Sequence, residues 1–352
     1  MQFYPGRKIV IACIFIAVVV VLLGAFTRLS HAGLGCPDWP TCYGHLWVPS
    51  SAAEIASANL SFAETPVETD KTWPEQIHRI FASSLGLFII ALVVVCFRNR
   101  QEPQQPLKLS YLLLVLVIVQ GLFGMWTVTL KLWPQVVTAH LLGGFSTLAL
   151  LWLMLQRLSL YSWPQTGQPA RSISSISWWA VFSLVVVALQ ILLGGWTSSN
   201  YAALACPDLP TCQNQWFPSA DFSQGFNFLQ HIGPNYLGGL LDNEGRIAIH
   251  LSHRIGAIIT SAVLLVLAWR LWHLAPGKPR RWSLILMAVL ILQVCLGLSN
   301  IYWSLPLPVA VVHNGIGALL LLVLVTLNHR LWCLKRIMKK ITERSENSKV
   351  AL

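Results

Sequence analysis

Eight long runs of apolar residues constrain this chain more than any other feature. A helix needs about 20 mainly apolar residues to cross the hydrocarbon core of a bilayer. The runs, with approximate ends, are 9–27, 76–97, 109–130, 134–155, 178–197, 247–271, 282–302 and 307–332. They predict an all-α polytopic membrane protein with eight transmembrane helices.

The composition excludes the two soluble domains that 352 residues could otherwise form. Charged residues make up 11% of the chain and hydrophobic residues 55%, whereas soluble domains are about 25% charged. The first run continues into Gly33-Leu-Gly-Cys36 instead of a small-residue cleavage site. We therefore interpret it as a retained helix and not as a cleaved signal peptide.

The net charge of +11 follows membrane topology. Most lysines and arginines fall in segments that share a side with the N-terminus, including the basic run 330–349, and most acids fall on the other side. Positive residues collect on the cytoplasmic side of membrane proteins. This bias predicts that both termini are cytoplasmic, and it explains the basic excess without nucleic-acid binding.

Three sequence markers occur twice, at nearly equal offsets, which indicates a tandem duplication. They are Cys36-Pro-Asp-Trp-Pro-Thr-Cys42 with Cys206-Pro-Asp-Leu-Pro-Thr-Cys212, His78-Arg-Ile with His253-Arg-Ile, and the segments around His140 and His313. Four spans per unit give both units the same orientation, related by a pseudo-twofold axis along the membrane normal. The predicted parts are an N-terminal four-helix bundle (1–157), a cytoplasmic linker (158–177), a C-terminal four-helix bundle (178–335) and a basic cytoplasmic tail (336–352).

Four histidines lie within or at the ends of the apolar spans: His78, His140, His253 and His313. Ionisable groups are costly there, so each suggests a functional site, although a single one is more often a packed, hydrogen-bonded residue. The topology places two in each bundle, on different helices, near the external face. Two imidazoles facing each other are what a six-coordinate heme iron requires. Zinc is the rival because His250 and His253 share a helix face, but zinc prefers three or four ligands.

Neighbouring residues suit a heme. Arg79 and Arg254 follow two of the histidines and are candidate contacts for the acidic heme propionates. Glycines near the other two histidines either make room for a porphyrin or allow close helix packing. These glycines are Gly143, Gly144, Gly315 and Gly317.

Glu75 makes the two halves different. It precedes His78 by three residues on the same helix face, and the equivalent position in the second half is His250. A carboxyl group beside one site could move protons for an oxidation. It could instead orient His78 or favour the helix N-terminus, so catalytic and structural roles both stay open.

The two cysteine pairs lie in the predicted external loops. An oxidising compartment permits the disulfides Cys36–Cys42 and Cys206–Cys212, which we expect. The alternative is that a pair is redox-active and exchanges electrons with the neighbouring heme site.

In their order and duplication, these markers resemble the heme A synthase family, from about residue 7 to 336. The resemblance implies an enzyme that oxidises a methyl group of heme O to the formyl group of heme A, by two hydroxylations or by electron removal and water attack. It implies that His78 and His140 ligate the substrate heme with Glu75 assisting, and that His253 and His313 ligate the iron of a retained heme b.

The resemblance also implies a bacterial cytoplasmic membrane, and a heme O synthase and a membrane electron donor or acceptor as partners. The alternative is a diheme b-type electron carrier or quinol oxidoreductase, which the same four histidines would serve. Glu75 and the external position of both sites argue against it. A transporter that uses the histidines as proton relays is a third, weaker interpretation.

Overall fold

The computed structural model describes residues 4–159, 170–274 and 277–350, and the regular secondary structure in this part of the chain is α-helix. Within them, the β-structure is limited to two isolated bridges in the cysteine loops. The helices are α1 (Arg7–Leu29), α2 (Ala52–Ser61), α3 (Thr69–Arg98), α4 (Leu107–Thr129), α5 (Pro134–Leu158), α6 (Ala170–Ser199), α7 (Phe222–Gly225), α8 (Asn243–Leu274), α9 (Lys278–Tyr302) and α10 (Leu307–Val350). Eight of these are long and apolar enough to cross a membrane, which confirms the predicted fold class.

The helices continue beyond the apolar runs. The helix α3 begins at Thr69, before the expected start at residue 76, and α6 begins at Ala170, before the expected start at residue 178. Hydropathy detects only the part of a helix that lies in hydrocarbon, whereas polar residues extend the same backbone hydrogen bonding outside it. The predicted linker is thus helical from Ala170, and its residues 160–169 lie outside the described chain. The predicted tail continues α10 to Val350, and residues 351–352 lie outside the description.

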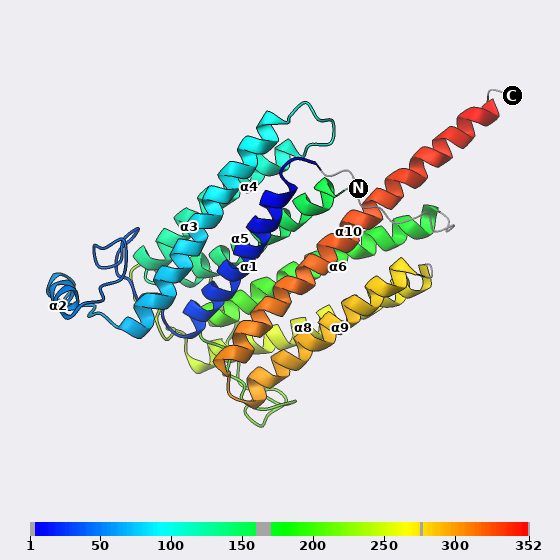
Figure 1. Cartoon of the computed structure of the whole chain (residues 1–352). Helices are drawn as coiled ribbons and strands as arrows, with labels where there is room; N and C mark the ends of the chain where they lie inside the picture. Colours follow the sequence, from blue (N-terminus) through cyan, green and yellow to red (C-terminus); the bar gives the residue numbers. More distant parts are fainter. Residues whose placement is uncertain (1–3, 160–169, 275–276, 351–352) are drawn as a thin grey trace.

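The spanning helices form two groups of four, one from each half of the chain (Figure 1). In the first group α1 and α4 each pack on both α3 and α5, and in the second α6 and α9 each pack on both α8 and α10. The groups meet through α1, α5, α6 and α10. The same order of neighbours in both groups agrees with a duplicated unit, and the pseudo-twofold relation itself stays a prediction.

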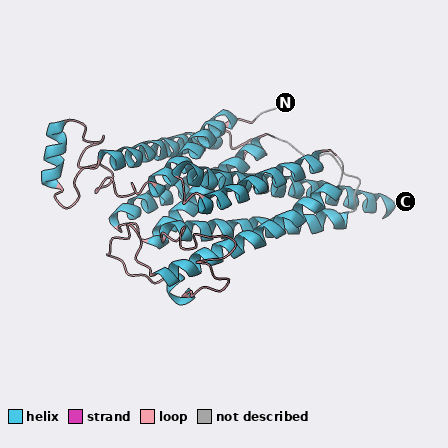
Figure 2. Cartoon of the chain, turned by 90° about the horizontal axis from the view of Figure 1, so that it is seen from below, coloured by secondary structure: helices cyan, strands magenta, loops and turns pink. Residues whose placement is uncertain are grey.

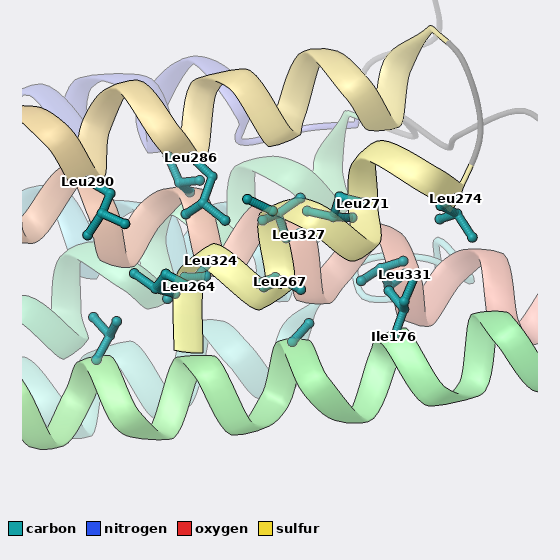
Figure 3. Packing of buried hydrophobic residues seen from close by; sticks show 14 of the residues in the cluster. Ile176, Leu264, Leu267, Leu271, Leu274, Leu286, Leu290, Leu324, Leu327 and Leu331 are labelled. Carbon is teal, nitrogen blue, oxygen red and sulfur yellow. The ribbon is translucent and has the colours of Figure 1, made fainter. Parts of the chain in front are cut away.

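Each group has a leucine-rich core away from its cysteine loop. In the C-terminal group, buried leucines of α8, α9 and α10 point toward one another and toward α6 (Figure 3). Those labelled include Leu267, Leu271, Leu286, Leu327 and Leu331. This core fills the ends of the helices that lie farther from the loops, so the four histidines lie at the other end.

Two long loops cover that other end. The loop between α1 and α3 carries α2 and Cys36–Cys42, and the loop between α6 and α8 carries α7 and Cys206–Cys212. Both loops lie at the opposite end of the helices from the start of α1 and the end of α10 (Figures 1 and 2). The cytoplasmic placement of both termini of this multi-pass membrane protein stays a prediction.

Candidate functional site

His78 of α3 and His140 of α5 face each other inside the N-terminal group. Their ring centroids are 6.5 Å apart, with the ring planes at 84°. A metal-bound imidazole nitrogen lies about 2 Å from its metal, so two imidazoles on one ion have centroids roughly 6 Å apart. The observed spacing fits one iron between them. Nδ1 of each ring is buried without a hydrogen-bond partner, which argues against two ordinary packed histidines.

A glycine on a neighbouring helix faces each of the two rings. A Cβ atom on Gly24 of α1 would lie 3.0 Å from Cε1 of His78, and one on Gly124 of α4 would lie 3.5 Å from Cε1 of His140. The His78 ring therefore occupies space that a Cβ on Gly24 would contest, whereas a Cβ on Gly124 would make an ordinary contact with the His140 ring. Sequence analysis missed both glycines, because their partners lie on other helices.

The glycines expected beside a porphyrin have other neighbours. A Cβ on Gly143 would collide with the Gln120 side chain, and one on Gly315 would lie 2.8 Å from Cδ2 of Leu22. Gly144 and Gly317 likewise face the glutamines Gln120 and Gln293. These contacts support close helix packing, the other role that the sequence left open for them.

The second pair repeats this arrangement. His253 of α8 and His313 of α10 each lie beside a glycine of a neighbouring helix, as His78 and His140 do. Cβ atoms on Gly194 and Gly297 would lie 3.3 and 3.2 Å from Cε1 of His253 and His313, respectively. Nε2 of Gln190 lies 3.1 Å from Nδ1 of His253. Each half thus holds two histidines on different helices, each beside a glycine, and such a pair is a donor set suited to an iron already bound by four porphyrin nitrogens.

Among the described residues, no group of three or more histidine, cysteine, aspartate or glutamate side chains is arranged to hold a metal ion. His250 does not join His253 in such a group, because its Nδ1 accepts a hydrogen bond from the Cys206 backbone N–H at 3.1 Å. The donor sets in this part of the chain are therefore pairs of histidines, which suit heme iron better than a tetrahedral zinc ion.

Glu75 is buried and its carboxylate binds the Cys36 loop. Oε2 accepts a hydrogen bond from the Cys36 backbone N–H at 2.9 Å, and Oε1 accepts one from Nη2 of Arg79 at 2.5 Å. In the second half, His250 accepts the equivalent N–H from Cys206. Glu75 and His250 therefore play the same structural role: each holds the cysteine loop of its half to the helix that carries it. This supports a structural role for Glu75, and a catalytic role stays a prediction.

Arg79 and Arg254 also bind the cysteine loops. Nη1 of Arg79 donates to the carbonyl oxygens of Asp38 and Thr41 at 3.0 and 2.8 Å. Arg254 donates to the carbonyl oxygens of Thr211, Cys206 and Asp208 at 2.8, 2.6 and 2.9 Å. Both guanidinium groups thus connect a histidine-bearing helix to its loop, and their contact with propionates stays a prediction.

Both cysteine pairs are joined as disulfides, with Cα–Cα distances of 4.8 Å for Cys36–Cys42 and 4.5 Å for Cys206–Cys212. An aspartate closes each loop: Asp38 accepts from the backbone N–H of Tyr43 at 2.6 Å. Hydrogen bonds, first from the Thr211 hydroxyl, lower the pKa of the equivalent Asp208. Burial, followed by nearby carboxylates, raises the pKa of Tyr43 to about 12. The loops are therefore tightly folded, which suits a structural disulfide, and a redox role remains open.

Comparison with known proteins identifies the family. The model of the COX15-CtaA family, described as cytochrome oxidase assembly protein, matches residues 7–325. The chain belongs to this family. The heme A synthase of Shewanella oneidensis is 46% identical, over 89% of this chain and 93% of its own length. Those of Allorhizobium ampelinum and Caulobacter vibrioides are 30% and 29% identical, over 86% and 89% of this chain and 84% and 92% of their own lengths. The resemblance predicted from the sequence is confirmed.

Proposed function

We propose that this chain is a membrane oxidoreductase that converts a methyl group of heme O to the formyl group of heme A. The observation that carries the proposal is the pair His78 and His140, whose 6.5 Å spacing fits one iron. Membership of the COX15-CtaA family, and relatives named heme A synthase, favour this activity over electron transfer alone.

The N-terminal pair is the proposed substrate site. His78 and His140 hold the iron of heme O, which brings the reacting methyl group and the redox chemistry of its porphyrin. Glu75 lies one helical turn before His78, with its charge balanced by Arg79 at 2.5 Å. The Glu75 carboxylate is the proposed acceptor of a proton from the reaction.

The C-terminal pair is the proposed site of a retained heme b. His253 and His313 hold it, and His250 takes the place of Glu75 without adding a carboxylate. This half therefore lacks the acid that the first half carries, as expected for a site that passes electrons but does no chemistry on its heme. Arg79 and Arg254 are the proposed propionate contacts.

The placement of the sites argues against the diheme carrier. His78, His140, His253 and His313 all lie near the starts of their helices, on the side of the cysteine loops. A carrier that moves electrons across the membrane would need hemes near both faces. We place the loop side outside a bacterial cytoplasmic membrane and both termini in the cytoplasm, on the positive-inside rule. Heme O synthase, as the source of substrate, and a membrane electron donor or acceptor are the proposed partners.

The activity is tested by producing the chain in bacteria that make heme O but no heme A. Membrane hemes are then extracted and separated by chromatography. Heme A is expected with the native chain, and its loss is expected in His140→Ala. The proposal is wrong if the native protein binds two hemes and yet leaves only heme O in the extract.

A further inference from the structure

Three of the four histidine-bearing helices share a contact that the fourth lacks. On the neighbouring helix, a glutamine stands four residues before the glycine that faces the histidine ring. The pairs are Gln120 with Gly124, Gln190 with Gly194, and Gln293 with Gly297. Each glutamine lies against a glycine of the histidine-bearing helix: Gly143, Gly256 and Gly317, respectively. We call this arrangement the glutamine clamp.

The clamp connects each glutamine to the histidine beside it. Nε2 of Gln120 donates to the His140 carbonyl oxygen at 2.8 Å. Nε2 of Gln190 donates to the His253 carbonyl oxygen at 3.0 Å and lies 3.1 Å from the Nδ1 atom of the same residue. Nε2 of Gln293 lies 3.4 Å from Nε2 of His313. The glycines permit this approach, since a Cβ on Gly256 would collide with Oε1 of Gln190.

The helix pair α1 and α3, which carries His78, has neither part of the clamp. Val20 stands four residues before Gly24, where the other three helices have glutamine. Phe81 stands three residues after His78, at the position equivalent to Gly256. Both changes occur together: the amide is replaced by an aliphatic side chain, and the glycine by a large ring.

The clamp is thus missing from the site that we propose for the substrate heme. A substrate heme must enter and a product heme must leave in every turnover, whereas a retained heme must stay. A heme held by two histidines leaves only after both bonds between histidine and iron have broken. We propose that His78 is the first of the two to release during heme exchange, because its helix pair lacks the glutamine clamp that holds His140, His253 and His313. Val20 and Phe81 are then the two positions at which the helix pair α1 and α3 departs from the glutamine clamp.

The proposal rests on the proposed function and is tested by a separate readout. Val20→Gln with Phe81→Gly installs the clamp, and Val20→Leu with Phe81→Gly is the matched control that makes the space without the amide. Purified protein is mixed with excess apomyoglobin, and the hemes left on the protein are extracted and identified over time. Interhelical hydrogen bonds in membranes change equilibria by roughly threefold to twentyfold. We expect the clamp variant to release heme from the N-terminal site more slowly than its control by that factor.

A reciprocal variant covers the case in which the double variant does not fold. Gln190→Leu removes the clamp from the C-terminal site and is expected to speed release of its heme by a similar factor. Equal release rates for the clamp variant and its control would overturn the proposal, as would unchanged release from folded Gln190→Leu. The identity of the extracted hemes tests the proposed function independently: two copies of heme b would refute that function, while the release rates would still report on His78.

Discussion

Replacing Gly24 with alanine should weaken heme binding at the N-terminal site. A Cβ at this position would lie 3.0 Å from Cε1 of His78, whereas carbon atoms in contact rest about 3.5–4.0 Å apart. The ring must therefore move by about 0.5 Å, which disturbs its alignment with His140. Overpacking costs about 1–3 kcal/mol, and at the lower limit this corresponds to roughly fivefold weaker retention of heme.

The chain offers a matched control on the other side of the site. In Gly124→Ala the new Cβ would lie 3.5 Å from Cε1 of His140, an ordinary contact, so heme retention should be nearly unchanged. Alanine favours helix more than glycine does, so loss of heme in Gly24→Ala would not reflect a weaker helix. The assay is the ratio of N-terminal-site heme to protein after purification in detergent. Equal heme retention in both variants would contradict the predicted collision between a Cβ on Gly24 and His78.

Three further predictions follow from the loops. Glu75→Gln and Glu75→His should keep both hemes but form no heme A. Heme binding should survive because His250 shows that an imidazole can hold the equivalent loop. Full activity in either variant would show that the carboxylate takes no part in the mechanism. Replacing Cys36 and Cys42 with serine should lower heme content at the N-terminal site alone, whereas a variant with both hemes and no turnover would indicate a redox role. Backbone N–H groups, first that of Ser51, lower the pKa of Glu54 to about 2. The charged form of Glu54 caps α2. The backbone amides of this helix should therefore be fully protected from hydrogen exchange above about pH 4.5 and lose protection as the pH falls through about 2. Unchanged protection in Glu54→Ala at neutral pH would contradict this prediction.

The sequence predicted the spanning helices and the paired histidines because both leave periodic signals. Apolar length identifies a span without any knowledge of its neighbours. The duplication then aligned His78 with His253 and His140 with His313. Helix ends were less predictable: α3 and α6 start earlier than hydropathy indicates because their first turns are polar.

The contacts of Glu75 could not be predicted, because they depend on how a distant loop folds back. Its partner Cys36 is 39 residues away in the chain. The sequence therefore left catalytic and structural roles equally open, and the structure adds evidence for the second. The glutamines were also missed, although the repeated spacing Gln-x-x-x-Gly at positions 120, 190 and 293 was a visible signal. Its meaning required knowing which helices are neighbours.

The proposed function requires that the two histidine pairs bind different hemes, one as substrate and one as cofactor. Acid extraction of the purified protein, with chromatography and mass analysis, tests it most directly when applied to the native chain, His140→Ala and His313→Ala. We expect heme b together with heme O or heme A from the native chain, loss of heme O and heme A from His140→Ala, and loss of heme b from His313→Ala. Two copies of heme b from the native chain, or loss of the same heme from both variants, would contradict it.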